Sequence, residues 1–289
     1  MSGGASLVRP RNLLAFVHIE KAAGTSMIHL LRRNFCCRYF DARPMTGRSG
    51  NFFTADDLRL ALRIHPGLRC IGGHTVRPTD ELFERMPWIR YFTLLRDPVE
   101  RYYSHYRYWV RQMGQELTLA EFLEKPLSWN FQTVKIAGSQ DVERAKRILS
   151  ERFLVAGLVE ELDESLVLLR RALDFCDLDI DYAVANRGVV HPRDREILER
   201  HRSQIAAVNA LDVELYAHVR DVLLPRYRAR LSPDLETELR AFRAGRRPQE
   251  ERSSWRMTAD KMFRHFWLNP VVGLIRVRHG LPASGSYGY

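Results

Sequence analysis

Short apolar runs recur along the chain, and polar loops and amphipathic helical patterns separate them. Four of these runs have the β-branched, aromatic and aliphatic composition of buried strands: Leu13–Ile19, Leu68–Gly73, Ile89–Leu95 and Phe153–Leu158. Strands that alternate with helices favour a parallel sheet covered by helices. The pattern therefore predicts an α/β fold.

The loop after the first predicted strand carries small residues and one lysine. The segment 16–26 is FVHIEKAAGTS, and an amphipathic helix with Thr25 or Ser26 as its cap is predicted to follow. Free N–H groups and the positive end of a helix dipole bind anions. The segment predicts a phosphate site, and an ordinary turn with a surface lysine is the alternative. It is not a Walker A loop, because Lys21 precedes Gly24 instead of following it.

A second strand–helix junction carries an arginine. Arg96 follows the strand 89–95, and Asp97 is placed to cap the helix that begins there. Ser104 lies about two turns along, roughly 10 Å by helical rise. Arg96 and Ser104 could hold one phosphate. In the alternative, Arg96 pairs with Asp97 or Glu100 and Ser104 faces solvent.

His74 directly follows the strand 68–73. Ligands of open parallel sheets collect beyond the carboxyl ends of the strands, so Lys21, His74 and Arg96 are predicted to meet in one crevice. A histidine whose pKa lies near 6.5 can accept a hydroxyl proton at neutral pH. In the alternative, His74 caps the next helix or bonds to a backbone carbonyl. His18 and His105 compete by location, with His18 expected to face the core.

Together these stretches resemble the sulfotransferase superfamily, and among its members the carbohydrate sulfotransferases related to uronyl and heparan sulfate 2-O-sulfotransferases. The segment 96–106, RDPVERYYSHY, matches the family pattern RDPxxRxxSxY. Further similar segments are found at 73–74, 130–138, 155–160 and 209–216, so the resemblance covers roughly Leu13 to Leu224 in order. It implies a P-loop-like three-layer α/β/α fold with a mainly parallel central sheet and a helical C-terminal extension.

The resemblance also implies a reaction and a set of site residues. The donor would be 3′-phosphoadenosine 5′-phosphosulfate (PAPS), and the acceptor a hydroxyl of a saccharide or glycoconjugate. Lys21 and His74 would be the catalytic residues, with His74 as the base. The 3′-phosphate would bind to Arg96 and Ser104, and the phosphosulfate to the loop residues Lys21, Ala23, Gly24, Thr25 and Ser26. Near the acceptor would lie Asn130, Gln132 and Thr133, although Asn130 could equally be a helix cap.

Two loop positions depart from the family pattern. Glu20 stands where members often carry Pro, and Ala22 stands where they often carry Thr. Ala22 removes one hydroxyl that could contact the phosphosulfate. Glu20 adds a negative charge beside a polyanionic ligand, so we expect it to point away or to pair with an arginine.

Composition limits the partners. The chain has 45 Lys and Arg against 35 Asp and Glu, a net charge of +10, which suits an anionic ligand. The basic residues are dispersed, so we expect no nucleic-acid partner. The four cysteines have no metal-ligand spacing, so we expect reduced thiols and no metal. With no secretory signal and no apolar run of about 18 residues, we expect a cytoplasmic protein without a transmembrane span.

The sequence changes character after Pro225. We predict a catalytic domain over residues 1–225 and a helical extension with a loose tail over residues 226–289. Phe266, Trp267 and the arginines around them could contact a membrane surface peripherally. Packing against the catalytic domain is the simpler expectation for this segment.

Two other functions fit parts of the sequence. A nucleotide-dependent kinase or NTPase on a similar scaffold should carry a Walker lysine and an aspartate at a strand end, whereas here Lys21 is misplaced and Arg96 follows the strand. A non-catalytic protein that binds the nucleotide would need neither Lys21 nor His74 for chemistry.

Overall fold

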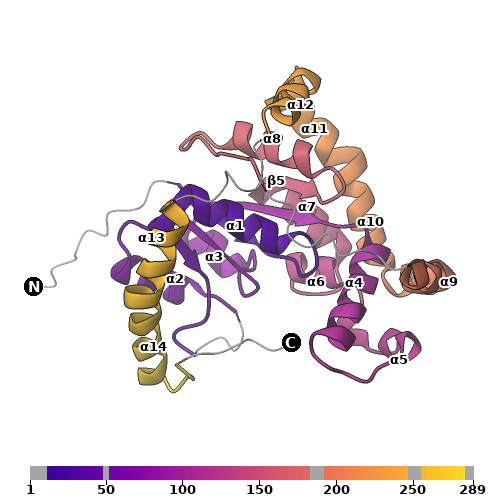
Figure 1. Cartoon of the computed structure of the whole chain (residues 1–289), viewed down its shortest axis with the longest axis horizontal. Coiled ribbons are helices and arrows are strands. Elements are labelled where there is room, and N and C mark those ends of the chain that lie inside the picture. Colours follow the sequence, from indigo (N-terminus) through magenta and orange to yellow (C-terminus); the bar gives the residue numbers. More distant parts are fainter. Residues whose placement is uncertain (1–11, 48–51, 183–191, 247–254, 284–289) are drawn as a thin grey trace, which may run out of the picture.

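Five parallel strands form the central sheet (Figure 1), in the order β2-β3-β1-β4-β5. The structure is a computed structural model that describes residues 12–47, 52–182, 192–246 and 255–283. The strands are β1 Leu13–Val17, β2 Tyr39–Asp41, β3 Cys70–Gly73, β4 Ile89–Leu95 and β5 Phe153–Leu158. The predicted α/β class and parallel sheet are confirmed, whereas β2 lies in a stretch that the sequence analysis did not identify as a strand.

Helices cover both faces of the sheet. The helices of the described residues are α1 Gly24–Phe35, α2 Ala55–Ile64, α3 Asp80–Arg85, α4 Pro98–Arg111, α5 Leu119–Leu123, α6 Phe131–Ala137, α7 Val142–Arg152, α8 Leu162–Ala172, α9 Pro192–Val208, α10 Ala210–His218, α11 Leu224–Leu231, α12 Leu235–Ala244, α13 Trp255–Phe263 and α14 Asn269–Arg278. Cys36–Arg38 and Pro126–Ser128 are 3₁₀ turns, and Val219–Leu223 and Arg264–Leu268 are π turns.

The order of the strands explains the layers. From β1 to β2 the chain moves along the sheet in one direction, and from β2 through β3 and β4 to β5 it moves in the other. Right-handed crossovers that run in opposite directions place their helices on opposite faces. In Figure 1, α1 accordingly lies in front of the sheet and α3 behind it. The arrangement is consistent with a three-layer α/β/α fold.

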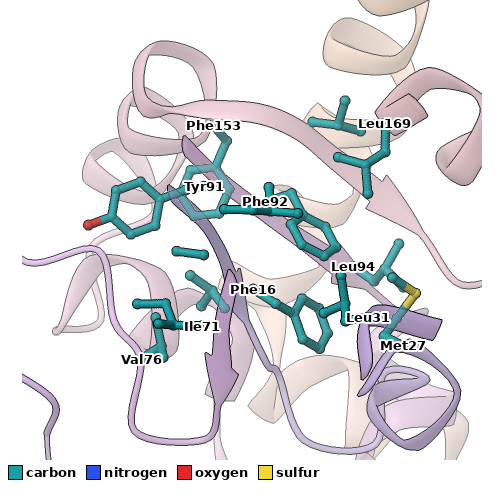
Figure 2. Packing of buried hydrophobic residues seen from close by; sticks show 14 of the residues in the cluster. Phe16, Met27, Leu31, Ile71, Val76, Tyr91, Phe92, Leu94, Phe153 and Leu169 are labelled. Atoms are coloured by element: carbon teal, nitrogen blue, oxygen red, sulfur yellow. The ribbon is translucent and has the colours of Figure 1, made fainter. Parts of the chain in front are cut away.

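The sheet provides the centre of the hydrophobic core. All five residues of β1 are fully buried, because β1 is the middle strand and has a layer on each face. Figure 2 shows Phe16 of β1 next to Phe92 of β4, with Met27 and Leu31 of α1 packed nearby. The Phe16 and Phe92 ring centroids are 4.9 Å apart. This rigid packing fixes where the carboxyl end of each central strand emerges.

A smaller core joins α4, α5 and α9. Its buried residues are Val99, Tyr102, Tyr103, Leu119, Phe122, Leu198 and Ile205. Tyr102 and Tyr103 of α4 are both buried in this cluster. This cluster supports the helix that follows Arg96.

The C-terminal helices pack into the same main core as the sheet. Leu235 and Leu239 of α12 and Val272 of α14 are buried in the cluster that contains β1. Residue 225, where the predicted domains meet, lies within a helical run that continues from the π turn 219–223 into α11. Part of the predicted tail, residues 284–289, lies outside the described residues.

Candidate functional site

The central strands β1 and β4 are neighbours whose connections leave in opposite directions. After β1 the chain turns toward the β2 edge, and after β4 it continues toward the β5 edge. The carboxyl ends of such a strand pair form the crevice in which ligands of doubly wound sheets bind. Lys21 follows β1 and Arg96 follows β4, so both lie at this switch point.

The backbone of the loop after β1 is shaped to present N–H groups. Lys21 and Ala23 have φ angles of 68° and 57°, and the residues beside them do not share this left-handed conformation. Alternating conformations of this kind turn successive N–H groups into one concavity, which favours anions. Helix α1 begins at Gly24 after Ala23, so the predicted side-chain cap by Thr25 or Ser26 is wrong. Both residues instead lie in the first turn, where backbone N–H groups lack intrahelical acceptors.

Gly24 allows the His18 ring to lie against the start of α1. A Cβ atom at position 24 would stand 1.5 Å from His18 Nε2, so no other residue fits with the ring in this place. The His18 ring also stacks on the His74 ring, with 4.0 Å between centroids. The loop and the strand end of β3 are therefore in direct contact.

His74 is bound to a buried carboxylate. Its Nδ1 lies 3.0 Å from Glu20 Oε1, while about half of its side chain, 47%, stays exposed. Lys135 of α6 donates to Glu20 Oε1 at 2.9 Å and to the His74 backbone carbonyl at 2.6 Å. Glu20 and Lys135 are both almost fully buried. Glu20 is paired as expected, although its partners are a lysine and a histidine rather than an arginine.

The two other histidines near the crevice lie inside the protein. Burial, followed by the electrostatic effect of the neighbouring His74, lowers the pKa of His18 well below its usual value. Burial and then Arg101 lower the pKa of His105 to about 3. His105 Nε2 also accepts a hydrogen bond from the Trp109 indole at 3.1 Å. Of these three rings, His74 is the one with substantial exposure to solvent.

Arg96 connects the two loops. Its Nη1 donates to the Lys21 carbonyl at 3.2 Å, and its Nη2 lies 3.5 Å from Glu100 Oε2. The predicted alternative, a pair with Glu100, is therefore present together with the contact to the loop. Asp97 caps α4 as predicted by accepting from the Glu100 N–H at 3.0 Å. Ser104 lies half-buried on the same helix.

Positive side chains gather around Lys21. Burial, followed by the charges of Arg96 and Arg107, lowers the pKa of Lys21. The Lys21 ammonium lies over the Tyr108 ring, 4.7 Å from its centroid. Clustered cations that depress one another's affinity for protons favour a bound anion, because the anion relieves their repulsion.

The three residues expected near an acceptor are used inside the protein. Gln132 and Thr133 are fully buried and Asn130 nearly so. The Gln132 side chain accepts from the Arg96 N–H at 3.0 Å and donates to the Arg96 carbonyl at 2.9 Å. Asn130 Oδ1 accepts from the Leu211 N–H at 3.0 Å. The geometry therefore gives Gln132 a role in holding Arg96, and it gives Asn130 the role of a cap on α10.

Some of the predicted site residues contact one another in the structure, whereas others are linked only through neighbouring side chains. Lys21 contacts Arg96, and His74 contacts the loop through Glu20 and His18. Ala23, Gly24, Thr25 and Ser26 form the turn that opens α1. The sequence analysis did not identify Lys135 as a site residue. The one indication in the sequence is that Lys135 is the single charged residue of the segment 130–138.

The fold and the site define an α/β protein in which Lys21, His74 and Arg96 follow the carboxyl ends of three neighbouring strands of a parallel sheet. A scan against protein-family models and a search of curated proteins found no match for this chain.

Proposed function

We propose that the protein is a PAPS-dependent O-sulfotransferase, a member of the P-loop-like carbohydrate sulfotransferases that its motifs resemble. One observation carries the proposal: an exposed histidine, held by a buried carboxylate, adjoins a loop that presents a lysine and backbone N–H groups. Base and anion site together suit the transfer of an anionic group to a hydroxyl.

The residues of the crevice fit the two anionic ends of such a donor. The turn from Lys21 to Ser26, with its concave backbone and helix N-terminus, would hold the phosphosulfate. Arg96, fixed at its backbone by Gln132, would hold the 3′-phosphate together with Ser104. When bound, PAPS supplies the sulfuryl group that is transferred.

His74 and Lys21 would share the chemical work. His74 Nε2 takes the proton from the acceptor hydroxyl while the hydroxyl oxygen bonds to sulfur. The bond between sulfur and the bridging oxygen breaks, and the Lys21 ammonium stabilises the negative charge left on that oxygen. Glu20 accepts a hydrogen bond from His74 Nδ1–H and so keeps Nε2 as the basic atom. A saccharide hydroxyl is the proposed acceptor, on the strength of the motif resemblance.

Calorimetric titration with the product 3′,5′-adenosine bisphosphate tests the proposal. We expect micromolar binding that is indifferent to Mg²⁺, and we expect Lys21→Ala and Arg96→Ala each to weaken it at least about tenfold, the usual scale for a lost charged contact. Arg90→Ala is the matched control, because Arg90 is exposed on β4, at the far end of the strand from Arg96. A panel of saccharide acceptors then tests transfer, which His74→Ala should reduce by about 10²–10⁴-fold.

Three results would contradict the proposal. Binding of ATP that requires Mg²⁺, without bisphosphate binding, would favour a kinase or NTPase. Bisphosphate binding without transfer to any acceptor would favour a non-catalytic nucleotide-binding protein. Near-normal transfer by His74→Ala would refute the assignment of the base.

A further inference from the structure

A stripe of exposed apolar side chains follows the helical run 255–278. Trp255, Phe266 and Leu274 are 76%, 71% and 73% exposed. Six of the twelve large apolar side chains exposed among the described residues lie on this run: Trp255, Met262, Phe266, Trp267, Leu274 and Val277. We call these six residues the C-terminal stripe. Such a concentration on one element marks an interaction surface.

The opposite face of the run attaches it to the protein. Leu268 and Val272 are buried in the main core. Arg276 Nη1 donates to the Pro44 carbonyl, and Arg43 Nη2 donates to Asn269 Oδ1 at 2.7 Å. The π turn 264–268 advances fewer degrees per residue than an α-helix, and so brings residues before and after it onto common faces. The stripe is thus held outward by a fixed inner face.

The charge around the stripe is positive. Between residues 255 and 283 the chain carries five basic residues, Arg256, Lys261, Arg264, Arg276 and Arg278, against one acid, Asp260. Asp260 is fully buried and pairs with Arg264, and Arg276 is buried as well, so the exposed charge of this segment comes from Arg256, Lys261 and Arg278. A cavity of about 480 Å³ at Trp255 is lined by Arg38, Arg69 and Arg256, with Asp177 among its other lining residues.

We propose that the C-terminal stripe binds the surface of an anionic lipid bilayer, with the run 255–278 lying in the plane of the interface. Tryptophan and phenylalanine beside basic residues are the composition of interfacial helices. Among the described residues, no helix has the length and apolar character needed to cross a membrane. A second copy of the chain is the less favoured partner, because it would bring the same positive charges together. In Figure 1 the run lies on the other side of the molecule from α4, α5 and α9.

Co-sedimentation of the full chain with lipid vesicles tests this proposal and needs no knowledge of the reaction. We expect binding to vesicles of phosphatidylcholine mixed with phosphatidylglycerol, weaker binding to phosphatidylcholine alone, and weaker binding as salt rises. Phe266→Ser combined with Leu274→Ser should reduce the partition coefficient at least about tenfold. Met113→Ser combined with Leu127→Ser is the matched control, because both residues are exposed outside the stripe.

The outcomes separate the possible partners. Loss of binding in the stripe variant, with the control variant unchanged, supports the proposal. Equal binding of the stripe variant, or equal binding to neutral and anionic vesicles, overturns it. Absence of vesicle binding by the wild type also overturns the proposal. If the wild type is then a dimer and the stripe variant a monomer in analytical ultracentrifugation, the C-terminal stripe is an interface between two copies of the chain.

Discussion

Glu20 is an ionised side chain inside the protein, and its neighbours explain why the carboxylate stays ionised there. Burial alone would raise the pKa of its carboxyl group, but the Lys135 charge and the His74 hydrogen bond outweigh burial and hold the pKa far below its usual value. Because the folded-state pKa is lowered, the ionised carboxylate stabilises the fold above its unfolded pKa of about 4.3. That stabilisation is lost as the pH falls toward the folded-state pKa.

Glu20→Gln should separate catalysis from nucleotide binding. The amide no longer provides an anionic acceptor for His74 Nδ1–H, so we expect turnover to fall by about 10²–10⁴-fold. The affinity for 3′,5′-adenosine bisphosphate should change by less than about threefold, because the loop backbone and Arg96 remain. Steady-state kinetics and calorimetry measure the two quantities. Unchanged turnover would show that Glu20 does not position the base.

A second variant controls for stability. Glu20→Gln leaves Lys135 buried without its counter-charge, which should lower the free energy of unfolding by about 3–5 kcal/mol at neutral pH. Glu20→Gln with Lys135→Met removes both charges and should recover much of this stability, while turnover stays low. Recovery of turnover together with stability would mean that the single variant failed only because it was poorly folded. In acid, the stability difference between the wild type and the single variant should narrow.

At this scale the sequence predicted which residues meet, but not all of their partners. Lys21 and Arg96 are in contact, as expected for residues that follow adjacent parallel strands. The partner of Glu20 could not be chosen, because Lys135 lies more than a hundred residues away and reaches Glu20 only through the placement of α6. Thr25 and Ser26 were misjudged as caps because the left-handed Ala23 begins the helix earlier than side-chain chemistry indicates.

Helices α6 and α10 cap each other at their amino ends. The Asp212 carboxylate of α10 accepts from the Gln132 and Thr133 N–H groups of α6, at 3.0 and 2.7 Å. In return, Asn130 accepts from the first turn of α10. Burial raises the pKa of Asp212, and these donors together with Arg101 oppose that shift. The exchange fixes Gln132, which in turn holds the backbone of Arg96.

Asp212→Ala should therefore cost more than the loss of an ordinary cap. Two buried N–H groups and the Thr133 hydroxyl lose their acceptor, so we expect the free energy of unfolding to fall by about 3 kcal/mol. Asp141→Ala is the matched control, because Asp141 caps α7 with one bond at an exposed site and should cost about 1 kcal/mol. Denaturant titration measures both changes. If the two variants lose the same free energy of unfolding, the buried reciprocal cap stabilises the protein no more than an ordinary exposed cap does.

Most strands of the sheet could be predicted because their apolar runs are long enough to be recognised in the sequence. The predicted strands 89–95 and 153–158 have the observed limits. Strand β2 was missed because it has three residues, too few for periodicity to appear between Arg38 and Arg43. Its position depends on pairing with β3, which is a tertiary interaction.

In the molecule as a whole, the C-terminal helices and the sheet share one core. Leu268→Ala should therefore lower the free energy of unfolding by about 2–5 kcal/mol, since Leu268 is only 2% exposed. Leu274→Ala on the same helical run is the matched control, because that side chain faces outward and should change stability by less than about 0.5 kcal/mol. Thermal unfolding followed by fluorescence and far-ultraviolet circular dichroism measures both.

The shape of the transition distinguishes one cooperative unit from two. With a shared core, Leu268→Ala should move a single transition and keep the two probes coincident. A separate low-temperature transition that moves alone in this variant would show that residues 226–289 unfold independently of the sheet. That result would favour the predicted boundary at residue 225 as a true boundary between domains.

The central position of β1 also has a consequence for synthesis on the ribosome. Of the five described strands, β1 is the first to be made, and it pairs with β3 on one side and with β4 on the other. At the usual ~5–20 residues per second, translation from β1 to β4 takes roughly 4–14 s, and during this time the apolar LLAFV segment has no complete sheet to join. The nascent chain is therefore expected to be a client of holding chaperones. The crevice and the sheet should form together, once β4 and Arg96 have left the exit tunnel.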